Sequence, residues 1–364
     1  MKAVIAMDSF KGSLTSLQAG DAVRRGIMRA CPDAAVTVFP LADGGEGTAD
    51  AIAPYVNGIT KIVMVTGPLG TPVDADYIFS EETKTAYIEM AKAAGLTLIK
   101  QEERNPYLTT TYGVGELIKD AVAGGAQKLV ICIGGSATND GGAGMLQALG
   151  AKFLDRHGNS IKPGAAGLKD LHTIDMTDLT GKHIDITVAS DVTNPLCGPD
   201  GASFVYGPQK GATEEMCMEM DTWLRNYAET AGFDPFEAGT GAAGGMSFAL
   251  KNFLGARIGS GAEIVMKTTG IETEIMTCNI VITGEGCMDS QTVKGKAPYK
   301  VLQLGKRHNK PVYGITGILG DGYEECLKAG FTRIIPLADP TMDTEAAVRS
   351  VEATAARLFK DQKC

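Results

Sequence analysis

The sequence predicts an α/β protein in which the first and last parts of the chain share one parallel sheet and the middle part is an inserted second domain. Near both ends, short apolar runs typical of buried strands alternate with loops and helices, which is the order of βαβ units. Between residues 59 and 90, β-rich runs follow one another through short turns, as in an antiparallel meander. A chain of 364 residues also exceeds the size at which a single core stops growing, so two domains are expected.

The first part of the chain predicts a strand, a helix and a second strand, over Lys2–Met7, Ser16–Ala30 and Ala35–Leu41. Each strand ends in a loop that combines acidic residues with glycine or serine. Because parallel strands end at the same edge of a sheet, these loops should place one set of side chains there: Asp8, Lys11, Asp43 and Glu46.

The middle part predicts the three strands of the meander, Ile59–Thr66, Pro72–Phe79 and Thr85–Met90. Further elements are expected over Tyr112–Ala123 (helix), Lys128–Ile133 and Ile184–Ala189 (strands) and Met246–Leu254 (helix). The stretch G-T-G-A-A-G-G at 239–245 contains a G-x-G-x-x-G pattern, but no strand precedes it. We therefore interpret it as a flexible loop that could face a ligand, not as a dinucleotide fingerprint.

The last part returns to the order of strand, loop and helix, with strands over Asn279–Ile282, Pro311–Ile315 and Arg333–Pro336. The predicted domains are residues 1–58 plus 265–364, and residues 59–264.

Composition and charge restrict the partners of the protein. The formal net charge of −9 argues against nucleic acid or an anionic membrane surface. No apolar stretch approaches the ~20 residues needed to cross a bilayer, and the first apolar run is too short for a signal sequence. The eight cysteines contain no C-x-x-C pair, which disfavours a zinc site. We expect a soluble cytoplasmic protein, and the sequence leaves its oligomeric state open, a homo-oligomer included.

The stretch from Cys278 to Lys300 carries the densest set of functional groups. An apolar strand is expected to break at Thr283 into a glycine-containing loop, followed by a helix. Between them lie carboxylates, hydroxyl and amide side chains and lysines: Glu285, Asp289, Ser290, Gln291, Thr292, Lys294 and Lys296. Oxygen ligands, close backbone N–H groups and fixed positive charge are what a magnesium-bound polyphosphate requires.

Similar polar, glycine-containing loops follow other predicted strands, at 8–13, 43–48, 134–142 and 191–202. None of them contains histidine, which disfavours Ser-His-Asp hydrolysis, Cys-His catalysis and histidine-based zinc sites. Phosphoryl transfer fits better, because it depends mainly on positioning and charge neutralisation. The chain contains neither a Walker A motif nor protein-kinase motifs, so it is neither a P-loop enzyme nor a protein kinase.

Six motifs in order resemble the bacterial glycerate kinase family of type I. They are D-S-F-K-G-S-L (8–14), P-L-A-D-G-G-E-G-T (40–48), G-G-S-A-T-N-D-G-G (134–142), D-V-T-N-P-L (191–196), G-P-Q-K-G-A (207–212) and T-G-E-G-x-x-D-x-Q-T-x-x-G-K-A-P (283–298). The resemblance implies ATP- and Mg²⁺-dependent phosphorylation of D-glycerate, with 2-phosphoglycerate expected over 3-phosphoglycerate. It also implies a Rossmann-like domain built from both chain ends, an inserted mixed α/β domain, and an active-site cleft between them.

With this activity, the residues receive hypothetical roles. A kinase that acts on an alcohol needs a carboxylate to orient or deprotonate the hydroxyl, and we assign this role to Asp191. The expected metal ligands are Asp8, Asp43 and Asp289. Lys294 is expected to assist catalysis at the phosphates, where it could exchange roles with Lys296. The remaining residues expected to bind the nucleotide are Gly284, Glu285, Gly286 and Gln291.

The substrate carboxylate needs a cation or a nest of N–H groups, which Lys11 or the amides of Gly134–Ser136 could supply. The side chains expected to contact the substrate's oxygens are Ser9, Ser136, Thr138, Asn139 and Asp140. Two other functions stay open. A phosphohydrolase could use Asp8 as its nucleophile, although residue 10 is phenylalanine and the usual D-x-D is absent. A non-catalytic effector-binding protein would keep the loops without the chemistry.

Overall fold

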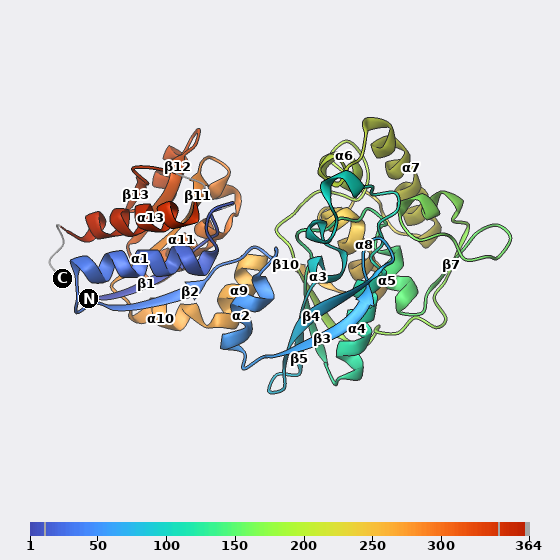
Figure 1. The fold of residues 1–364 in the computed structure, drawn as a ribbon, viewed down its shortest axis with the longest axis horizontal. Coiled ribbons are helices and arrows are strands. Elements are labelled where there is room, and N and C mark those ends of the chain that lie inside the picture. Colours follow the sequence, from blue (N-terminus) through green and yellow to red (C-terminus); the bar gives the residue numbers. More distant parts are fainter. Residues whose placement is uncertain (11, 341–342, 361–364) are drawn as a thin grey trace. The chain divides into compact units, whose positions relative to one another are not determined.

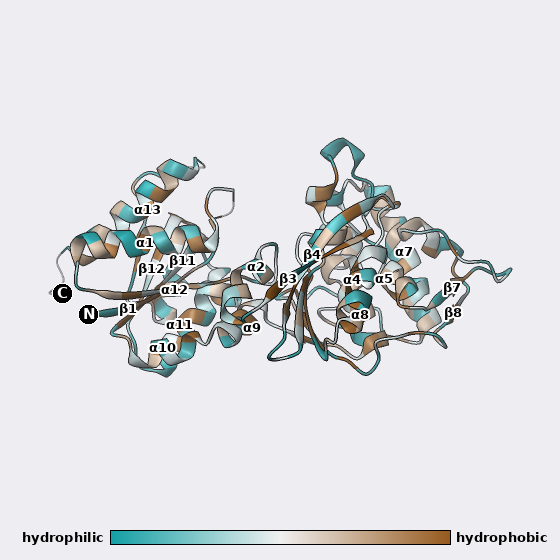
Figure 2. Cartoon of the chain, turned by 60° about the horizontal axis from the view of Figure 1, so that its bottom comes forward, coloured by the Kyte–Doolittle hydropathy of each residue, from teal (hydrophilic) through white to brown (hydrophobic). Residues whose placement is uncertain are grey.

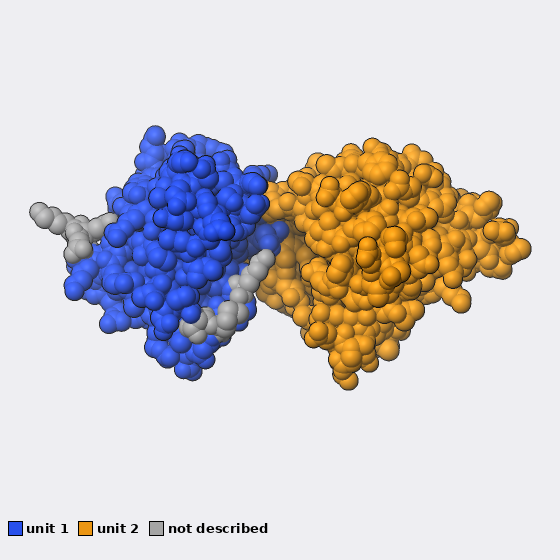
Figure 3. All heavy atoms as spheres, turned by 90° about the horizontal axis from the view of Figure 1, so that it is seen from above, with its two compact units in different colours: residues 1–43, 262–364 blue, residues 44–261 orange. Residues whose placement is uncertain are grey.

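The computed structural model describes residues 1–10, 12–340 and 343–360 (Figure 1). The chain divides into two compact units, which Figure 3 shows in two colours. Unit 1 comprises residues 1–43 and 262–364, and unit 2 comprises residues 44–261. Each unit contains its own main sheet, and each is described here by itself.

The sheet of unit 1 is fully parallel and contains strands from both ends of the chain. Its order is β13-β12-β11-β1-β2. The strands are β1 (Lys2–Met7), β2 (Ala35–Pro40), β11 (Ile280–Met288), β12 (Val312–Leu319) and β13 (Arg333–Pro336). The predicted parallel sheet, shared by the first and last parts of the chain, is therefore confirmed.

Strand β1 is apolar along its length because both faces of this sheet are covered. Ala3, Ile5 and Met7 belong to one core cluster, whereas Val4 and Ala6 belong to another on the opposite face. Figure 2 shows the result as largely hydrophobic strands beside helices of mixed hydropathy.

Helices α1 (Ser16–Ala30) and α13 (Thr344–Phe359) contribute to the first cluster, and α10 (Ile271–Thr277), α11 (Ala297–Arg307) and α12 (Glu324–Ala329) contribute to the second. The segment that enters unit 1 from unit 2 begins with α9 (Gly261–Thr269), which also contributes to the second cluster. Gly26 allows α1 to approach α13 closely, since a Cβ there would lie 2.3 Å from the carbonyl oxygen of Glu352.

Unit 2 contains a mixed six-stranded sheet with the order β10-β9-β6-β5-β4-β3. Its strands are β3 (Ile59–Thr66), β4 (Pro72–Ser80), β5 (Thr85–Glu89), β6 (Lys128–Cys132), β9 (Asp185–Ala189) and β10 (Arg257–Gly259). The pairs β3–β4 and β4–β5 are antiparallel, as the meander predicted, and β5, β6, β9 and β10 are parallel. The α/β fold class is thus confirmed in both sheets.

The α-helices of unit 2 are α2 (Thr48–Ile52), α3 (Ala91–Ala94), α4 (Tyr112–Ala123), α5 (Ala143–Ala148), α6 (Ala202–Tyr206), α7 (Glu214–Ala231) and α8 (Ala242–Leu254). Short 3-10 turns include η5 (Pro208–Lys210), and a small hairpin joins β7 (Lys152–Leu154) to β8 (Thr173–Asp175). Among the described residues, no helix is both long and apolar enough to cross a membrane.

Strands β11 and β12 continue beyond their predicted ends. The sequence predicted a loop from Thr283, but β11 runs to Met288 and pairs with β12 as far as Leu319. Gly284 makes this possible, since its Cβ would lie 1.7 Å from the carbonyl oxygen of Ile315. Glycine in this stretch therefore serves close strand pairing and does not open a loop.

The glycine-rich stretch 239–245 also differs from its prediction as a flexible loop. Ala243, Gly244 and Gly245 have left-handed backbone angles, and both glycines are buried. A Cβ on Gly244 would lie 2.0 Å from the carbonyl oxygen of Thr138. These residues form a closely packed bend before the regular part of α8.

Residues 44–58, expected with the terminal parts of the chain, fall in unit 2. Hydrogen bonds explain their place: the amide of Gly134 donates to the carbonyl of Gly44, and the carboxylate of Glu89 accepts from the amides of Gly47 and Ala49. The exact domain limits expected from the sequence stay a prediction.

Candidate functional site

The carboxyl-terminal edge of the unit 1 sheet holds several of the predicted residues. Asp8 follows β1, and its amide donates to the carbonyl oxygen of Gly284 on β11 at 2.8 Å. Since Met7 pairs with Gly284, the register places Asp8 level with Glu285. Residues 285 to 289 of an extended strand span about 13 Å, so Asp289 lies well beyond this level. Strand pairing thus brings Asp8 next to Glu285, not next to Asp289.

A cluster of charged and hydroxyl groups, the Glu285 cluster, surrounds the last part of β11. It consists of Glu285, Asp289, Thr292 and Lys296. The ammonium of Lys296 lies 3.3 Å from a carboxylate oxygen of Glu285 and 3.3 Å from one of Asp289. The hydroxyl of Thr292 donates to Glu285 at 2.7 Å. One lysine therefore holds two carboxylates together.

The two carboxylates have opposite pKa shifts. Burial raises the pKa of Glu285, which is only 8% exposed, and the Thr292 and Lys296 bonds offset this effect in part. Burial also acts upward on the pKa of Asp289, but hydrogen bonds from the amide of Gln291 and from Lys296 outweigh it and lower the pKa. The site contains a more basic carboxylate beside a more acidic one.

The structure separates the two lysines that the sequence left interchangeable. Lys296 is ion-paired, whereas Lys294 ends the short turn η6 (Thr292–Lys294) and is exposed. Gln291 has an exposed side chain, and its backbone N–H donates a hydrogen bond to the carboxylate of Asp289. Gly284 and Gly286 lie within β11, and the carbonyl of Gly284 is bonded to Asp8.

The other predicted residues of unit 1 follow β1 and β2. The amide of Ser9 donates to the carboxylate of Asp8 at 2.7 Å. Asp43 follows β2, the neighbour of β1, and so lies at the same edge of the sheet. Lys11 lies outside the described residues. In the described part of the chain, no group of three or more His, Cys, Asp or Glu is arranged to hold a metal ion.

In unit 2, the loop 134–142 follows β6 and is organised by Asp140. This carboxylate is 1% exposed. It accepts hydrogen bonds from the amide and hydroxyl of Thr111 at 2.8 and 2.9 Å, and from the amides of Gly142 and Gly144 at 3.1 and 3.3 Å. Burial raises its pKa, and these four bonds act in the opposite direction. Asp140 is thus occupied in holding the loop.

Three other predicted substrate-binding side chains of this loop are buried. Asn139 donates to the hydroxyl of Ser203 at 2.8 Å, while its carbonyl oxygen and the hydroxyl of Thr138 have no hydrogen-bond partner among the described residues. Ser136 accepts a hydrogen bond from Lys210 at 2.9 Å. Buried polar atoms without a partner are uncommon in folded proteins. The Thr138 hydroxyl and the Asn139 carbonyl oxygen are therefore free to bond a ligand.

Asp191 follows β9 and has an exposed side chain. The nearby Asn194 is engaged on both sides: its side-chain NH₂ donates to the carbonyl of Asp200 at 2.8 Å, and its oxygen accepts from the hydroxyl of Tyr206 at 2.8 Å. This amide therefore fixes the loop that carries Asp191.

Sequence reasoning gave no role to Glu89 and Lys210. Glu89, at the end of β5, is 2% exposed and joins the loop at 44–49 to the sheet through two backbone amides. For Glu89, the sequence signal that could have been used is an acidic residue at the end of an apolar strand. Lys210, which is 1% exposed, was visible only as part of the G-P-Q-K-G-A motif.

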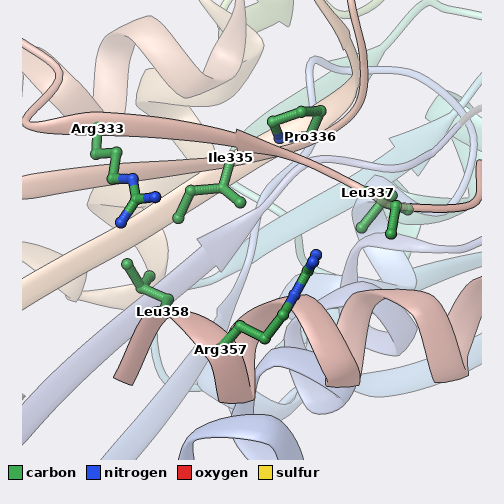
Figure 4. Close-up of a pocket in the computed structure, with 7 residues that line it drawn as sticks. Arg333, Ile335, Pro336, Leu337, Arg357 and Leu358 are labelled. Atoms are coloured by element: carbon green, nitrogen blue, oxygen red, sulfur yellow. The ribbon is translucent and has the colours of Figure 1, made fainter. Parts of the chain in front are cut away.

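A cavity of about 370 Å³ lies elsewhere in unit 1, between β13 and α13. Figure 4 shows Arg333 and Ile335 on the strand facing Arg357 and Leu358 on the helix. It contains none of the predicted site residues, and both arginines are exposed at its surface.

Comparisons with known proteins agree on one family. The model of the glycerate kinase family matches residues 3–361. The chain is 49% identical to glycerate 2-kinase of Escherichia coli K12 over 88% of this chain and 86% of that protein. It is 44% identical to glycerate kinase of Bacillus subtilis strain 168 over 98% and 96% of the two chains. A crystal structure from Salmonella typhimurium LT2, provisionally named glycerate kinase 2, superposes with a TM-score of 0.86 at 44% identity, covering 99% of this chain and 97% of that one. The chain is therefore a kinase that belongs to the glycerate kinase family.

Proposed function

We propose that this kinase transfers the γ-phosphoryl group of ATP to D-glycerate and yields 2-phosphoglycerate. The observation that carries the proposal is the Glu285 cluster, where a partly buried lysine pairs with two carboxylates at the end of a strand in a parallel sheet. Open α/β sheets bind ligands at the carboxyl ends of their strands. The curated relatives named glycerate 2-kinase and glycerate kinase support the choice of acceptor and of hydroxyl.

We assign the nucleotide to residues of unit 1. Carboxylate oxygens are the donors that Mg²⁺ prefers, so Asp8, Asp43 and Asp289 stay its proposed ligands. Because Asp289 lies well beyond the level of Asp8, these three carboxylates would not share one ion in the arrangement described above. When bound, Mg²⁺ would neutralise part of the phosphate charge. Lys294 is the proposed phosphate contact because its ammonium is exposed, whereas Lys296 holds the two carboxylates.

Glu285, Gly286, Gln291 and the Gly284 backbone stay proposed elements of the same nucleotide site. The carbonyl of Gly284 already accepts a hydrogen bond from the amide of Asp8. The contribution of Gly284 would therefore be its lack of a side chain, which allows β11 and β12 to approach closely. Glu285 would act through Lys296, which it orients.

We assign the acceptor to residues of unit 2. Asp191 would accept the proton of the substrate hydroxyl while that oxygen forms a bond to the γ-phosphorus, and the bond from this phosphorus to the leaving ADP oxygen breaks. The loop with Gly134, Ser136, Thr138 and Asn139 would contact the carboxylate and hydroxyls of glycerate, and Asp140 would hold this loop in place. Ser9, which belongs to unit 1, stays a predicted substrate contact. A cytoplasmic location, where ATP is abundant, is part of the proposal.

The test is ADP release by the purified full-length protein with and without D-glycerate, and with and without Mg²⁺. We expect ADP only when ATP, Mg²⁺ and D-glycerate are all present, and ¹³C NMR of the product should show phosphorylation at the 2-hydroxyl. A phosphohydrolase would instead cleave phosphate esters without ATP, and an effector-binding protein would do neither. Release of ADP that does not depend on D-glycerate would contradict the proposal.

A further inference from the structure

Lys210 is a fully buried lysine whose ammonium contacts the proposed substrate loop at two points. It ends the turn η5 and is 1% exposed. Its Nζ donates to the hydroxyl of Ser136 at 2.9 Å and to the carbonyl oxygen of Thr138 at 2.7 Å. A lysine is rarely fully buried, and an apolar side chain would fill the same space at lower cost. The ammonium itself therefore needs an explanation.

The direction of the bond to Ser136 provides one. A charged ammonium can only donate hydrogen bonds, so the Ser136 oxygen must accept. The hydroxyl hydrogen of Ser136 then points elsewhere, and no acceptor for it occurs among the described residues. The Ser136 hydroxyl is thus oriented to donate a hydrogen bond on the side that faces away from Lys210.

The backbone around Ser136 is fixed independently of Lys210. The amide of Leu96 donates to the carbonyl of Gly135, and the amide of Ala137 donates to the carbonyl of Ala94. The hydroxyl of Thr109 also donates to the carbonyl of Ala137. Loss of the ammonium should therefore change the orientation of the Ser136 hydroxyl more than the path of the loop.

We infer that Lys210 is a positioning residue that keeps the Ser136 hydroxyl as a donor to an oxygen of the acceptor substrate, either its carboxylate or a hydroxyl. This inference rests on the proposed function and adds to it the residue that sets the polarity of the acceptor site. Glycerate is an anion rich in acceptor oxygens, so a hydroxyl fixed as a donor suits it.

The charge state of Lys210 supports the same reading. Burial lowers its pKa to about 7, and the carboxylate of Asp140 acts in the opposite direction. Of the other titratable groups near this turn, Arg104 donates to the carbonyl of Gln209 at 3.5 Å, and Cys217 of α7 packs against Gly207. A neutral lysine amine has a lone pair and can accept the Ser136 hydrogen, which would withdraw it from the substrate.

The test compares Lys210→Met, Ser136→Ala and the double variant with wild type in the full-length enzyme. We expect each single variant to raise KM for D-glycerate roughly tenfold, as loss of one charge-assisted hydrogen bond would, and to leave KM for ATP unchanged. Because Lys210 acts through Ser136, the double variant should be no worse than either single one. The matched control is Gln209→Ala, an exposed neighbour on the same turn, which should behave as wild type.

The pH dependence gives a second readout that does not need a folded Lys210 variant. KM for D-glycerate should rise as the pH increases through about 7 in wild type, and this rise should be absent in Ser136→Ala. Multiplying effects in the double variant, an equal rise in KM for ATP, or identical pH profiles would overturn the inference. A wild-type enzyme that does not phosphorylate D-glycerate at all would instead overturn the proposed function, and this inference with it.

Discussion

The hydroxyl of Thr292 donates a hydrogen bond to the carboxylate of Glu285 across a 2.7 Å distance. Both residues are buried, and the bond joins the last part of β11 to the turn that follows it. The same turn is capped by Asp289, whose carboxylate accepts from the amides of Gln291 and Thr292 at 2.8 and 3.2 Å. These bonds hold strand and turn in one arrangement, which favours catalysis by pre-organised charge.

Lys296 and Lys294 should respond differently to removal of their charge. Lys296→Met leaves the carboxylates of Glu285 and Asp289 without their cation, so we expect a loss of about 1 kcal/mol in unfolding free energy and a large rise in KM for ATP. Lys294→Met should leave stability unchanged, because this lysine is exposed, and should raise KM for ATP, because it is the proposed phosphate contact. Urea unfolding and steady-state kinetics measure both effects.

Lys300→Met is the matched control for these two variants. Lys300 lies on α11 and pairs with Glu263 at 2.7 Å, outside the Glu285 cluster. Removal of its charge should change neither the KM for ATP nor the KM for D-glycerate. If Lys296→Met has the stability and the KM for ATP of the wild type, the Glu285 cluster has no part in nucleotide binding.

Asp140→Asn tests whether this carboxylate organises the loop. An amide presents an NH₂ group where the carboxylate accepts from several donors, so at least one buried amide loses its partner. We expect a loss of about 2–4 kcal/mol in unfolding free energy. Asp155→Asn is the control, since Asp155 also accepts from backbone amides, those of His157 and Asn159, on an exposed loop. Equal losses for the two variants would argue against a special role of Asp140.

Gly284→Ala tests the close pairing of β11 with β12. The added Cβ would lie 1.7 Å from the carbonyl oxygen of Ile315, so the two strands must separate. We expect a loss of more than about 2 kcal/mol, seen as a lower urea midpoint. Cys287→Ala, in the same strand but only partly buried, should cost less. A Gly284→Ala protein as stable as wild type would show that the strands adjust freely.

The two sheets were predictable because their strands have simple patterns. The apolar run of β1 indicated a strand covered on both faces, and the alternating run of β3 indicated a meander; the structure has both over the predicted residues. The extension of β11 past Ile282 was missed, because Gly284 and Gly286 are typical of loops and only the neighbouring strand makes them necessary.

The polar loops after the strands could be recognised in the sequence, and their meeting at one site stays a prediction. The partners of each side chain could not be predicted. Asp289, Glu285 and Lys296 come from one short stretch and lie close together in the structure. The burial of Asp140 depends on Thr111, far away in the sequence, and that of Lys210 depends on the path of loop 134–142. Contacts of this kind follow from tertiary packing, which a local pattern does not contain.

The depressed pKa of Lys210 should make stability depend on pH. Its pKa falls from an ordinary value of 10.5 to about 7 in the folded protein, so between these values the unfolded chain binds the proton more strongly. Stability from this residue therefore rises as the pH increases above 7, by up to about 1.4 kcal/mol per pH unit. Urea unfolding between pH 7 and 9 should show a smaller rise for Lys210→Met than for wild type. Parallel curves would show that the lysine is charged in the folded protein throughout this range.

Asp191→Asn should separate catalysis from folding. The side chain of Asp191 is exposed, so the isosteric amide should leave the urea midpoint unchanged. An amide cannot accept the proton of the substrate hydroxyl, and we expect turnover to fall by at least about 100-fold with KM for ATP little changed. Asp200→Asn, an exposed carboxylate in the same loop, should keep wild-type turnover. Asn194 fixes this loop through Tyr206 and the Asp200 carbonyl, and both variants keep these two hydrogen bonds. A loss of turnover confined to Asp191→Asn would therefore be due to the missing carboxylate and not to a displaced loop. Near-normal turnover in Asp191→Asn would remove this residue from the mechanism.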